Sequence, residues 1–258
     1  MQSIANIVAA PIRATRQAEC EKHGAYESQH YAGKIWSNCP ECSREAHAAA
    51  KAKDEARALA EEQRRWEASL ERSCIPERFL DRTLKNYEAK NEGQKRALAF
   101  AVAYADNFDK ALVTGRCALF VGLPGTGKTH LAAGIGLRLM SRDKRRVLFT
   151  TVMRAVRSIK ETWTRGAELT ESQAIAKLVA PDLLILDEVG VQFGSETEKL
   201  MLFDVLNERY ETRRPTLLIS NLDLDGVRAY LGERIFDRLR EDGGEAVAFD
   251  WASHRGQA

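Results

Sequence analysis

The chain has 258 residues, enough for one hydrophobic core and a small appendage, so we expect one or two domains. Its formal net charge of +2 indicates no particular partner, and its five cysteines, an odd number, argue against a disulfide framework and for a reducing compartment. No apolar run approaches the ~20 residues of a membrane span, and the chain does not open like a signal peptide, so a cytoplasmic protein is expected.

Two pairs of metal-binding residues stand near the start of the chain, with 15 residues between the pairs. The pairs are Cys20 with His23 and Cys39 with Cys42. Each pair can chelate from a tight turn, so together they fit one tetrahedral zinc ion with three sulfur ligands and one nitrogen ligand. The alternative is a set of unrelated reduced thiols beside a surface histidine; His30 and His47 lie nearby but lack the paired spacing. Because four protein ligands leave no position for water, the zinc is expected to be structural.

The segment 43–72 is predicted to form a long helix, because it is rich in Ala, Glu, Lys and Arg and contains neither Gly nor Pro. Its apolar positions are mostly Ala, so it is a spacer, a partner-binding helix or a merely solvated helix. Ile75-Pro76 marks a break. The sequence therefore predicts a zinc-binding N-terminal domain with its helix over 1–72 and a second domain over 73–258.

A segment with the sequence IPERFLDRTLKNY, residues 75–87, and a predicted helix over 94–108 lead up to the first expected strand of the second domain. The segment precedes a glycine-rich stretch, residues 122–129, whose sequence is typical of a phosphate-binding loop. It therefore either packs around the base of a bound nucleotide or is ordinary packing between domains. The sequence leaves both interpretations open.

The most informative stretch is GLPGTGKT, residues 122–129, which follows an apolar strand over 117–121 and opens a helix over 131–140. Glycines in such a loop let backbone N–H groups turn inward around a polyphosphate. Lys128 supplies a point charge to the outer phosphates, and the Thr129 hydroxyl is placed to hold Mg²⁺. The expected ligand is a nucleoside triphosphate. The residues predicted to bind it are Gly122, Pro124, Gly125, Thr126, Gly127, Lys128 and Thr129.

Positive charge is concentrated from residue 128 to residue 165, where ten basic residues and two acids give a local net charge of +8. Within this block we predict a strand over 147–151 and a helix over 153–163. Three cations recur on one face of that helix, with Trp163 at its end: Arg154, Arg157 and Lys160. A basic face beside an aromatic ring favours single-stranded nucleic acid; a solvated basic helix with a core Trp is the alternative.

An apolar strand over 182–187 ends in two acids, Asp187 and Glu188. This is the form of a buried parallel strand that delivers carboxylates at its carboxyl end. Asp187 would hold Mg²⁺ through water, and Glu188 would be the general base that polarises the attacking water. A further strand over 216–220 ends at Asn221, which either orients the lytic water or is a turn residue.

Alternating strands and helices, including a helix over 195–213, predict an α/β fold: a parallel sheet with helices on both faces and a ligand site at the strand ends. Three later arginines are candidates to stabilise charge on a nucleotide bound in the same subunit or in a neighbour. Arg234 and Arg238 lie in a predicted helix over 233–240, and Arg255 stands near the end. Surface salt bridging is the alternative for each.

Together, GLPGTGKTHLA, LLILDEVGVQ, the strand ending at Asn221, GERIFDRLR and WASHR resemble the DnaC/DnaI bacterial helicase loaders and the related IstB transposition ATPases, all AAA+ proteins. The likeness runs from about residue 75 to residue 255. It implies the following roles: Lys128 and Thr129 in Walker A, Asp187 and Glu188 in Walker B, Asn221 as sensor 1, Arg234 or Arg238 as a finger acting on a neighbour, and Arg255 as sensor 2. Arg238 is the favoured finger.

The N-terminal part departs from the DnaC pattern, which has no such Cys/His set, and is similar to the zinc-bearing helicase-binding domain of DnaI. This divided likeness fits a phage or prophage version as readily as a chromosomal one. How the chain would grip a helicase therefore stays open at this point.

The resemblance implies a Mg²⁺-dependent ATPase that places a hexameric replicative DNA helicase at an origin or fork. The zinc domain would dock on the helicase, while the AAA+ domain binds ATP and single-stranded DNA and self-associates through the ATP site. One alternative is an IstB-type transposition helper that acts with a transposase on duplex DNA. Another is a zinc-containing, nucleotide-switched DNA-binding adaptor. The zinc module favours the loader because it provides a dedicated docking piece.

Overall fold

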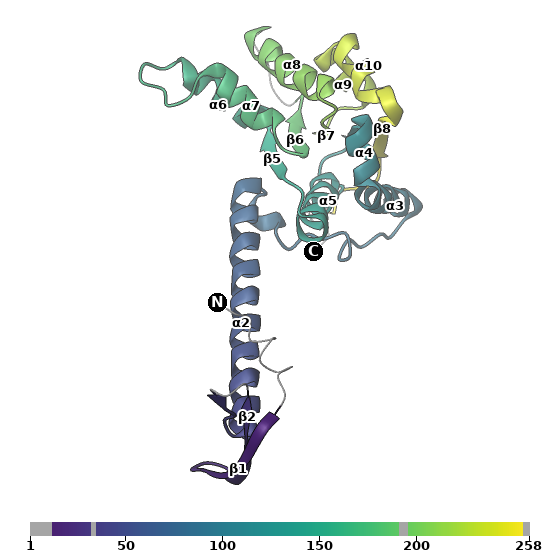
Figure 1. The fold of residues 1–258 in the computed structure, drawn as a ribbon. Coiled ribbons are helices and arrows are strands. Elements are labelled where there is room, and N and C mark those ends of the chain that lie inside the picture. Colours follow the sequence, from purple (N-terminus) through teal and green to yellow (C-terminus); the bar gives the residue numbers. More distant parts are fainter. Residues whose placement is uncertain (1–11, 32–34, 191–195, 255–258) are drawn as a thin grey trace. The chain divides into compact units, whose positions relative to one another are not determined.

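The computed structural model of the protein describes residues 12–31, 35–190 and 196–254 (Figure 1). By their internal packing they form two compact units, Met1–Arg65 and Trp66–Ala258. The division lies inside the long helix α2 (Pro40–Ser73), earlier in the chain than the predicted boundary after residue 72. None of the described helices combines the length and the apolarity that crossing a membrane requires.

The N-terminal unit contains a small antiparallel sheet of three strands in the order β1-β2-β3. The strands are β1 (Ile12–Cys20), β2 (Gly24–Tyr31) and β3 (Ile35–Trp36), and α2 follows them. The turn between β1 and β2 ends at Gly24, whose positive φ of 78° suits glycine. The sequence analysis predicted no strand in this part of the chain. A short sheet with most residues exposed has little of the polar-apolar alternation that identifies strands.

The second unit is built on a five-stranded sheet in the order β5-β6-β7-β4-β8, and every neighbouring pair is parallel. The strands are β4 (Ala118–Gly122), β5 (Val147–Thr151), β6 (Leu183–Val189), β7 (Thr216–Ser220) and β8 (Glu245–Phe249). Four of them were predicted to within two residues at each end. β8 was not, because it is an edge strand with mixed burial, while the central strand β7 is buried throughout.

Helices cover both faces of this sheet (Figure 1). On one face lie α3 (Glu92–Asp106), α4 (Phe108–Thr114) and α5 (Lys128–Asp143). On the other lie α6 (Val152–Lys160), α7 (Glu171–Val179), α8 (Glu196–Glu211), α9 (Leu224–Leu231) and α10 (Glu233–Arg240). Successive strand residues alternate between the two cores: Phe120 joins the first and Leu119 the second. The predicted parallel sheet with helices on both faces is confirmed.

Short 3-10 turns join the larger elements at η1 (Glu77–Phe79), η2 (Glu161–Trp163) and η3 (Glu241–Gly243). The predicted helix over 94–108 is divided at Asn107 into α3 and α4, and the predicted helix over 153–163 passes from α6 into η2. The sequence analysis missed α7, although Thr170 and Gln173 form a capping box at its start, which is a signal readable from sequence.

Candidate functional site

The phosphate-binding loop leaves the carboxyl end of β4 and enters α5 at Lys128. Gly122, Gly125 and Gly127 have φ of 123°, 77° and 98°, a region that side chains disfavour. A Cβ at Gly122 would also lie 2.4 Å from the Phe249 carbonyl oxygen, so only glycine fits there. The start of α5 has no side-chain cap, which leaves its first N–H groups available to an anion.

Lys128 is 5% exposed and donates two hydrogen bonds across the loop. Its Nζ lies 2.7 Å from the carbonyl oxygens of both Gly122 and Leu123. The ammonium group is therefore held against the phosphate-binding loop itself. This is the position from which a point charge can meet the outer phosphates of a triphosphate.

Asp187 and Thr129 meet at the carboxyl edge of the sheet. The Thr129 hydroxyl donates to Asp187 Oδ2 at 3.1 Å, and the Glu188 N–H donates to Asp187 Oδ1 at 2.7 Å. Magnesium binds oxygens at about 2.0–2.1 Å, so neighbouring ligands of an octahedral ion lie about 2.9 Å apart. The Thr129 hydroxyl can supply one such ligand, and Asp187, 3.1 Å away, can hold a water molecule that supplies the next. Burial is the main cause that raises the pKa of Asp187, so the free carboxylate lacks a full set of compensating partners.

Glu188 stands on a β-bulge. The pairing of β6 with β7 is regular up to Leu186 with Leu218 and resumes at Val189 with Ser220, so β6 carries one extra residue. Glu188 occupies this bulge with a φ of 61°, a left-handed conformation that a non-glycine residue adopts only when its surroundings impose it. The Glu188 side chain is exposed at the end of the strand.

The end of β7 is tied to this bulge by Ser220, which is buried. Its hydroxyl donates to the Val189 carbonyl at 2.6 Å and accepts from the Leu222 N–H at 3.0 Å. Asn221, which lies between Ser220 and Leu222 in the chain, is exposed. The two strand ends that carry Glu188 and Asn221 are thus joined by one side chain.

A pocket of about 230 Å³ opens beside the phosphate loop. Its lining residues come from the segment before α3, from the loop, from α5 and from the end of the chain: Arg82, Asn86, Tyr87, Glu88, Gly125, Gly127, His130 and His254. Burial raises the pKa of Tyr87 to about 12 and lowers that of His130, so both side chains are uncharged near neutral pH. Part of the segment 75–87 therefore lies beside the phosphate loop, where it would be near a nucleotide bound there.

Two residues that the sequence analysis did not single out hold the loop from behind. Trp251 Nε1 donates to the Thr126 carbonyl at 2.9 Å, and the His254 N–H donates to the Gly125 carbonyl at 3.0 Å. The Tyr87 hydroxyl reaches the Thr126 carbonyl as well, at 3.4 Å. Only the presence of Trp and His in the terminal WASHR motif hinted at this, and it does not indicate which atoms they contact.

The four predicted zinc ligands come together in the N-terminal unit, and their ligand atoms lie within 4.8 Å of one another. The Sγ atoms of Cys20 and Cys42 are 3.5 Å apart. His23 Nδ1 lies 3.7, 3.6 and 3.3 Å from the sulfurs of Cys20, Cys39 and Cys42. A tetrahedral ion with Zn–S of about 2.3 Å and Zn–N of about 2.0 Å needs separations of about 3.5–3.8 Å. The cluster therefore fits zinc.

The ring of His23 is oriented by a carboxylate. Its Nε2 lies 3.2 Å from Glu45 Oε1, and Lys22 donates to the same carboxyl group. A carboxylate on the far nitrogen is a common support for a zinc-bound imidazole, because it fixes which nitrogen faces the metal. His30 packs against Trp36 with tilted rings whose centroids are 4.7 Å apart, and neither it nor His47 belongs to the cluster.

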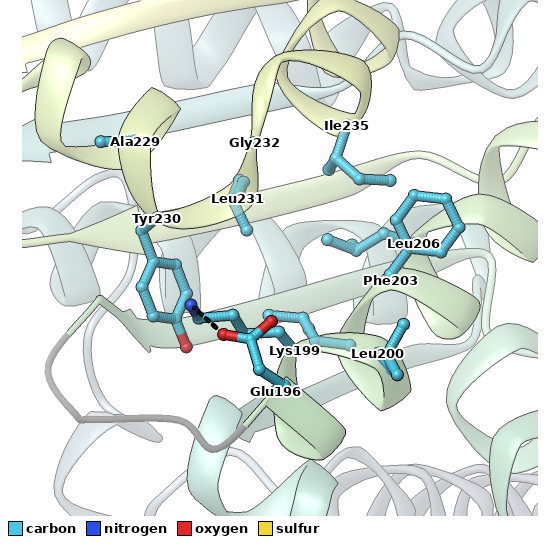
Figure 2. Close-up of a pocket in the computed structure, with 11 residues that line it drawn as sticks. Glu196, Lys199, Leu200, Phe203, Leu206, Ala229, Tyr230, Leu231, Gly232 and Ile235 are labelled. Atoms are coloured by element: carbon cyan, nitrogen blue, oxygen red, sulfur yellow. Dashed lines mark hydrogen bonds and ion pairs between the residues drawn. The ribbon is translucent and has the colours of Figure 1, made fainter.

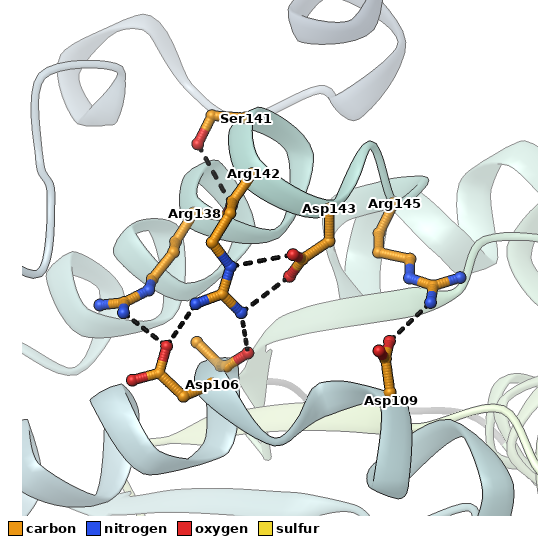
Figure 3. A network of polar contacts seen from close by, with 8 residues as sticks. Asp106, Asp109, Arg138, Ser141, Arg142, Asp143 and Arg145 are labelled. Carbon is orange, nitrogen blue, oxygen red and sulfur yellow. Dashed lines mark hydrogen bonds and ion pairs between the residues drawn. The ribbon is translucent and has the colours of Figure 1, made fainter.

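Much of the positive charge after the phosphate loop is neutralised by acids from elsewhere in the chain. On α5 and just after it, Arg138 and Arg142 both pair with Asp106, and Arg145 pairs with Asp109 (Figure 3). These contacts fasten α5 to α3 and α4. The net charge of +8 counted along the sequence therefore overstates the charge that this block presents to solvent.

Two of the three cations predicted on one face of α6 are exposed without an acidic partner among the described residues. Arg154 and Arg157 are exposed, and within the described part of the chain no acid pairs with either. Lys160 instead donates to Glu198 at 2.6 Å, so its charge is engaged. Trp163 is 54% exposed, which excludes the alternative of a core tryptophan, and its indole N–H donates to Glu171.

Comparison with known proteins assigns the family. Residues 54–242 match the model of the family described as IstB-like ATP binding protein. The chain belongs to this family. It is 37% identical over 186 residues to the replicative helicase loader DnaC of Buchnera aphidicola subsp. Baizongia pistaciae (strain Bp), covering 72% of this chain and 74% of that protein. It is 35% identical over 191 residues to the replicative helicase loader DnaC of Escherichia coli (strain K12), covering 74% of this chain and 76% of that protein.

Solved structures show the same AAA+ fold. The structure described as the DnaC helicase loader aligns with a TM-score of 0.61 at 23% identity, over 67% of this chain and 99% of that one. The DnaI structure aligns with a TM-score of 0.55 at 22% identity, over 67% and 93%. At these identities the likeness concerns the fold alone. The IstB-like region contains the phosphate loop and the acidic strand end but begins after the zinc ligands.

The two candidate finger arginines lie on α10, inside the IstB-like region, and the described contacts of both include aromatic rings. The Arg234 guanidinium lies 5.5 Å from the ring centre of Phe203, and that of Arg238 lies 4.7 Å from the ring centre of Tyr210. Arg238 Nη1 is buried without a hydrogen-bond partner in the described part of the chain. Arg255 lies outside the described residues.

Phe203 also lines a second pocket, of about 260 Å³, between α8 and the connection from α9 to α10 (Figure 2). Its walls are mostly apolar, with Leu200, Leu206, Leu231 and Ile235 around the ring. An ion pair between Glu196 and Lys199 lies at its edge. The one lysine in this lining, Lys199, is paired with Glu196, so the loop before α5 remains the candidate nucleotide site.

Proposed function

We propose that the chain is an ATP-dependent helicase loader that binds a hexameric replicative helicase and single-stranded DNA and places the helicase at an origin or fork. One observation carries this proposal. A chain more than one third identical to proteins named replicative helicase loader also brings Lys128, Thr129 and Asp187 together at one edge of a parallel sheet. Both the relatives and the site chemistry support a nucleotide-driven loader.

ATP hydrolysis is assigned to the residues at this edge. The glycines and the N-terminus of α5 bind the phosphates, and Lys128 contacts the outer ones. A magnesium ion bound by Thr129, and by Asp187 through water, would neutralise charge on the phosphates. Glu188 accepts a proton from the attacking water, and Asn221 on the adjoining strand end orients that water. We assign these roles to Glu188 and Asn221 because both side chains are exposed at adjoining strand ends, where they can meet water.

The zinc unit is assigned to docking on the helicase. Four closed ligands leave the metal no catalytic position, so zinc there would hold the small sheet β1-β2-β3 against the start of α2. A rigid module of this kind, joined to a long polar helix, suits partner recognition. The proposed domain limits stay at 1–72 for docking and 73–258 for the ATPase, and reduced thiol ligands suit a cytoplasmic setting.

Self-association through the ATP site is assigned to α10. Arg234 or Arg238 would reach the nucleotide of a neighbouring subunit, as an arginine finger that stabilises charge during hydrolysis, and Arg255 would contact the nucleotide as sensor 2. Mixing an Arg238→Ala protein with a Lys128→Ala protein tests this. Each variant keeps one half of a composite site, so the mixture should regain ATPase activity that neither shows alone. An inactive mixture would count against action across subunits by Arg238.

Helicase loading itself is tested by asking whether the host hexameric helicase is retained on circular single-stranded DNA only when this protein and ATP are present. Lys128→Ala is the matched control, because it removes the charge that contacts the phosphates while leaving the zinc unit intact. Retention that does not depend on the protein would overturn the proposal.

An IstB-type transposition helper is the second candidate, favoured by the family description itself. It predicts that a transposase, not the helicase, is bound and that duplex DNA stimulates ATP turnover more than single strands do. The third candidate, a nucleotide-switched adaptor, predicts ATP binding with almost no turnover. Measuring turnover with no DNA, single strands and duplexes separates all three.

A further inference from the structure

Two segments from opposite ends of the ATPase unit meet on a single carbonyl oxygen of the phosphate loop. Trp251, just after β8, donates its indole N–H to the Thr126 carbonyl at 2.9 Å, and Tyr87, before α3, directs its hydroxyl to the same oxygen at 3.4 Å. Thr126 is completely buried. A buried carbonyl without a donor is costly, so these two side chains satisfy a group that water does not reach.

The direction of this carbonyl decides the direction of the next N–H group. In a planar trans peptide the C=O of one residue and the N–H of the following residue point in opposite directions. Because the Thr126 carbonyl points toward Trp251, the Gly127 N–H points away from Trp251. The His254 N–H, which bonds the Gly125 carbonyl at 3.0 Å, orients the Thr126 N–H in the same manner.

Phosphate binding needs N–H groups that already point into the loop, because reorienting them upon binding lowers affinity. We propose that Trp251 is a positioning residue for the phosphate loop, with Tyr87 as its weaker partner: by bonding the Thr126 carbonyl from behind, they preset the loop for a triphosphate. The inference rests on the proposed nucleotide site and adds the terminal segment of the chain to it.

The position of Trp251 is itself tightly determined. The side chain is 8% exposed, and its ring lies 4.9 Å from that of Phe249, centre to centre. On the other side, a Cβ added to Gly93 would lie 2.9 Å from the indole ring, so only glycine allows this approach. Tyr87 is equally close to the loop, since a Cβ at Gly127 would lie 2.8 Å from its ring. Close packing on both sides gives the indole N–H one direction to donate.

The test compares Trp251→Phe with Tyr104→Phe. Trp251→Phe keeps an aromatic ring but removes the N–H. Tyr104→Phe is the matched control: it removes a buried hydroxyl that donates to the Arg116 carbonyl at 2.9 Å, at the opposite end of β4 from the loop. Binding of a non-hydrolysable ATP analogue with Mg²⁺, measured by calorimetry, should weaken roughly tenfold in Trp251→Phe and stay unchanged in the control. At saturating ATP, the turnover of Trp251→Phe should match that of the wild type.

Tyr87→Phe should weaken binding less than Trp251→Phe, because its hydrogen bond is longer. In the double variant, affinity for the analogue should fall by more than the product of the two single-variant fold-changes. The reason is that each donor partly replaces the other on the shared Thr126 carbonyl. Tyr87→Phe also decides the question if Trp251→Phe does not fold, because a Tyr87→Phe protein with wild-type affinity would then overturn the proposal.

A second readout does not involve nucleotide. In the free protein, backbone amide hydrogen exchange of residues 125–128 should accelerate in Trp251→Phe and not in Tyr104→Phe. Unchanged affinity and unchanged exchange in Trp251→Phe would overturn the inference while leaving the ATP site in place. A wild-type protein that fails to bind the analogue at all would instead remove the proposed function.

Discussion

The Thr129 hydroxyl lies 3.1 Å from a carboxylate oxygen of Asp187, although 58 residues separate the two in the chain. Thr129 lies on α5, which follows β4, and Asp187 lies on β6; these two strands are not neighbours, because β7 runs between them. The contact arises because α5 crosses the sheet toward β6: a Cβ at Gly136 on this helix would touch Ile185 of β6. Parallel strands then bring both oxygens to the same edge.

Magnesium-dependent nucleotide binding is expected to weaken on acidification. Burial raises the pKa of Asp187, so this carboxyl keeps its proton to a higher pH than an exposed aspartate and must release it to bind a cation. The negative charge of Glu188 opposes this release, and the positive charge of Lys128 favours it. Mg²⁺ titrations of nucleotide binding at a series of pH values measure the effect. Asp187→Asn should bind Mg²⁺ weakly at every pH, and a wild-type affinity that is flat through the acid range would contradict the assignment.

Replacing Glu188 by Gln should separate binding from hydrolysis. The amide keeps the size of the side chain but cannot accept a proton, so turnover should fall roughly a hundredfold or more while ATP still binds. Turnover and affinity are measured on the same protein. Lys128→Ala is the contrasting control, because it should lose affinity as well. A Glu188→Gln protein with full turnover would exclude Glu188 as the base.

Sequence signals succeeded where they were local. The phosphate loop, the acidic end of β6 and the buried strand β7 each carry their evidence within a few residues, and the structure brings Lys128, Thr129 and Asp187 together as predicted. The hydrogen bonds of Trp251 and Tyr87 to one carbonyl could not be predicted, because they join segments from the two ends of the unit. No short-range pattern encodes a shared acceptor.

The same limit applies to charge. Counting along the sequence made residues 128–165 strongly basic, yet Asp106 and Asp109, which precede that block, pair with three of its arginines and offset two of the positive charges. The small sheet of the zinc unit was missed for a different reason: most of its described residues are exposed, so its strands lack an apolar face to detect. Only the ligand spacing was readable there.

Arg209 is expected to be a major determinant of stability. Its side chain is completely buried and donates to the carbonyls of Leu178, Val179, Pro181 and Pro215 and to the Thr216 hydroxyl. Arg209→Met would remove a donor from each of these groups, and among the described residues only the Pro215 carbonyl keeps a second donor, the Leu184 N–H, so the free energy of unfolding should fall by about 3 kcal/mol or more. Urea denaturation measures this. Arg96→Met, at an exposed site on α3, is the control and should change little. Equal stability of the two variants would contradict the role of Arg209.

Zinc is expected at one ion per chain, measured by elemental analysis of the purified protein. Cys42→Ser removes one of four ligands, so the metal should be lost and the β1-β2-β3 sheet should unfold, while nucleotide binding by the other unit persists. Circular dichroism and nucleotide titration follow the two effects separately. His47→Ala is the control, because His47 lies outside the cluster and should leave the zinc content unchanged. Metal-free wild-type protein would refute the site.

Single-stranded DNA is expected to contact the exposed arginines of α6. Each phosphate contact contributes about 0.7 to the slope of log affinity against log salt, so replacing both Arg154 and Arg157 by Gln should lower the slope by about 1.4 and weaken binding. Lys160→Gln should change it less, because Lys160 already pairs with Glu198. Arg145→Gln is the matched control, since Asp109 neutralises Arg145 on another helix. Fluorescence anisotropy over a range of salt concentrations measures the slopes. If the double variant and Arg145→Gln behaved alike, α6 would be a solvated helix and the DNA surface would lie elsewhere on the protein.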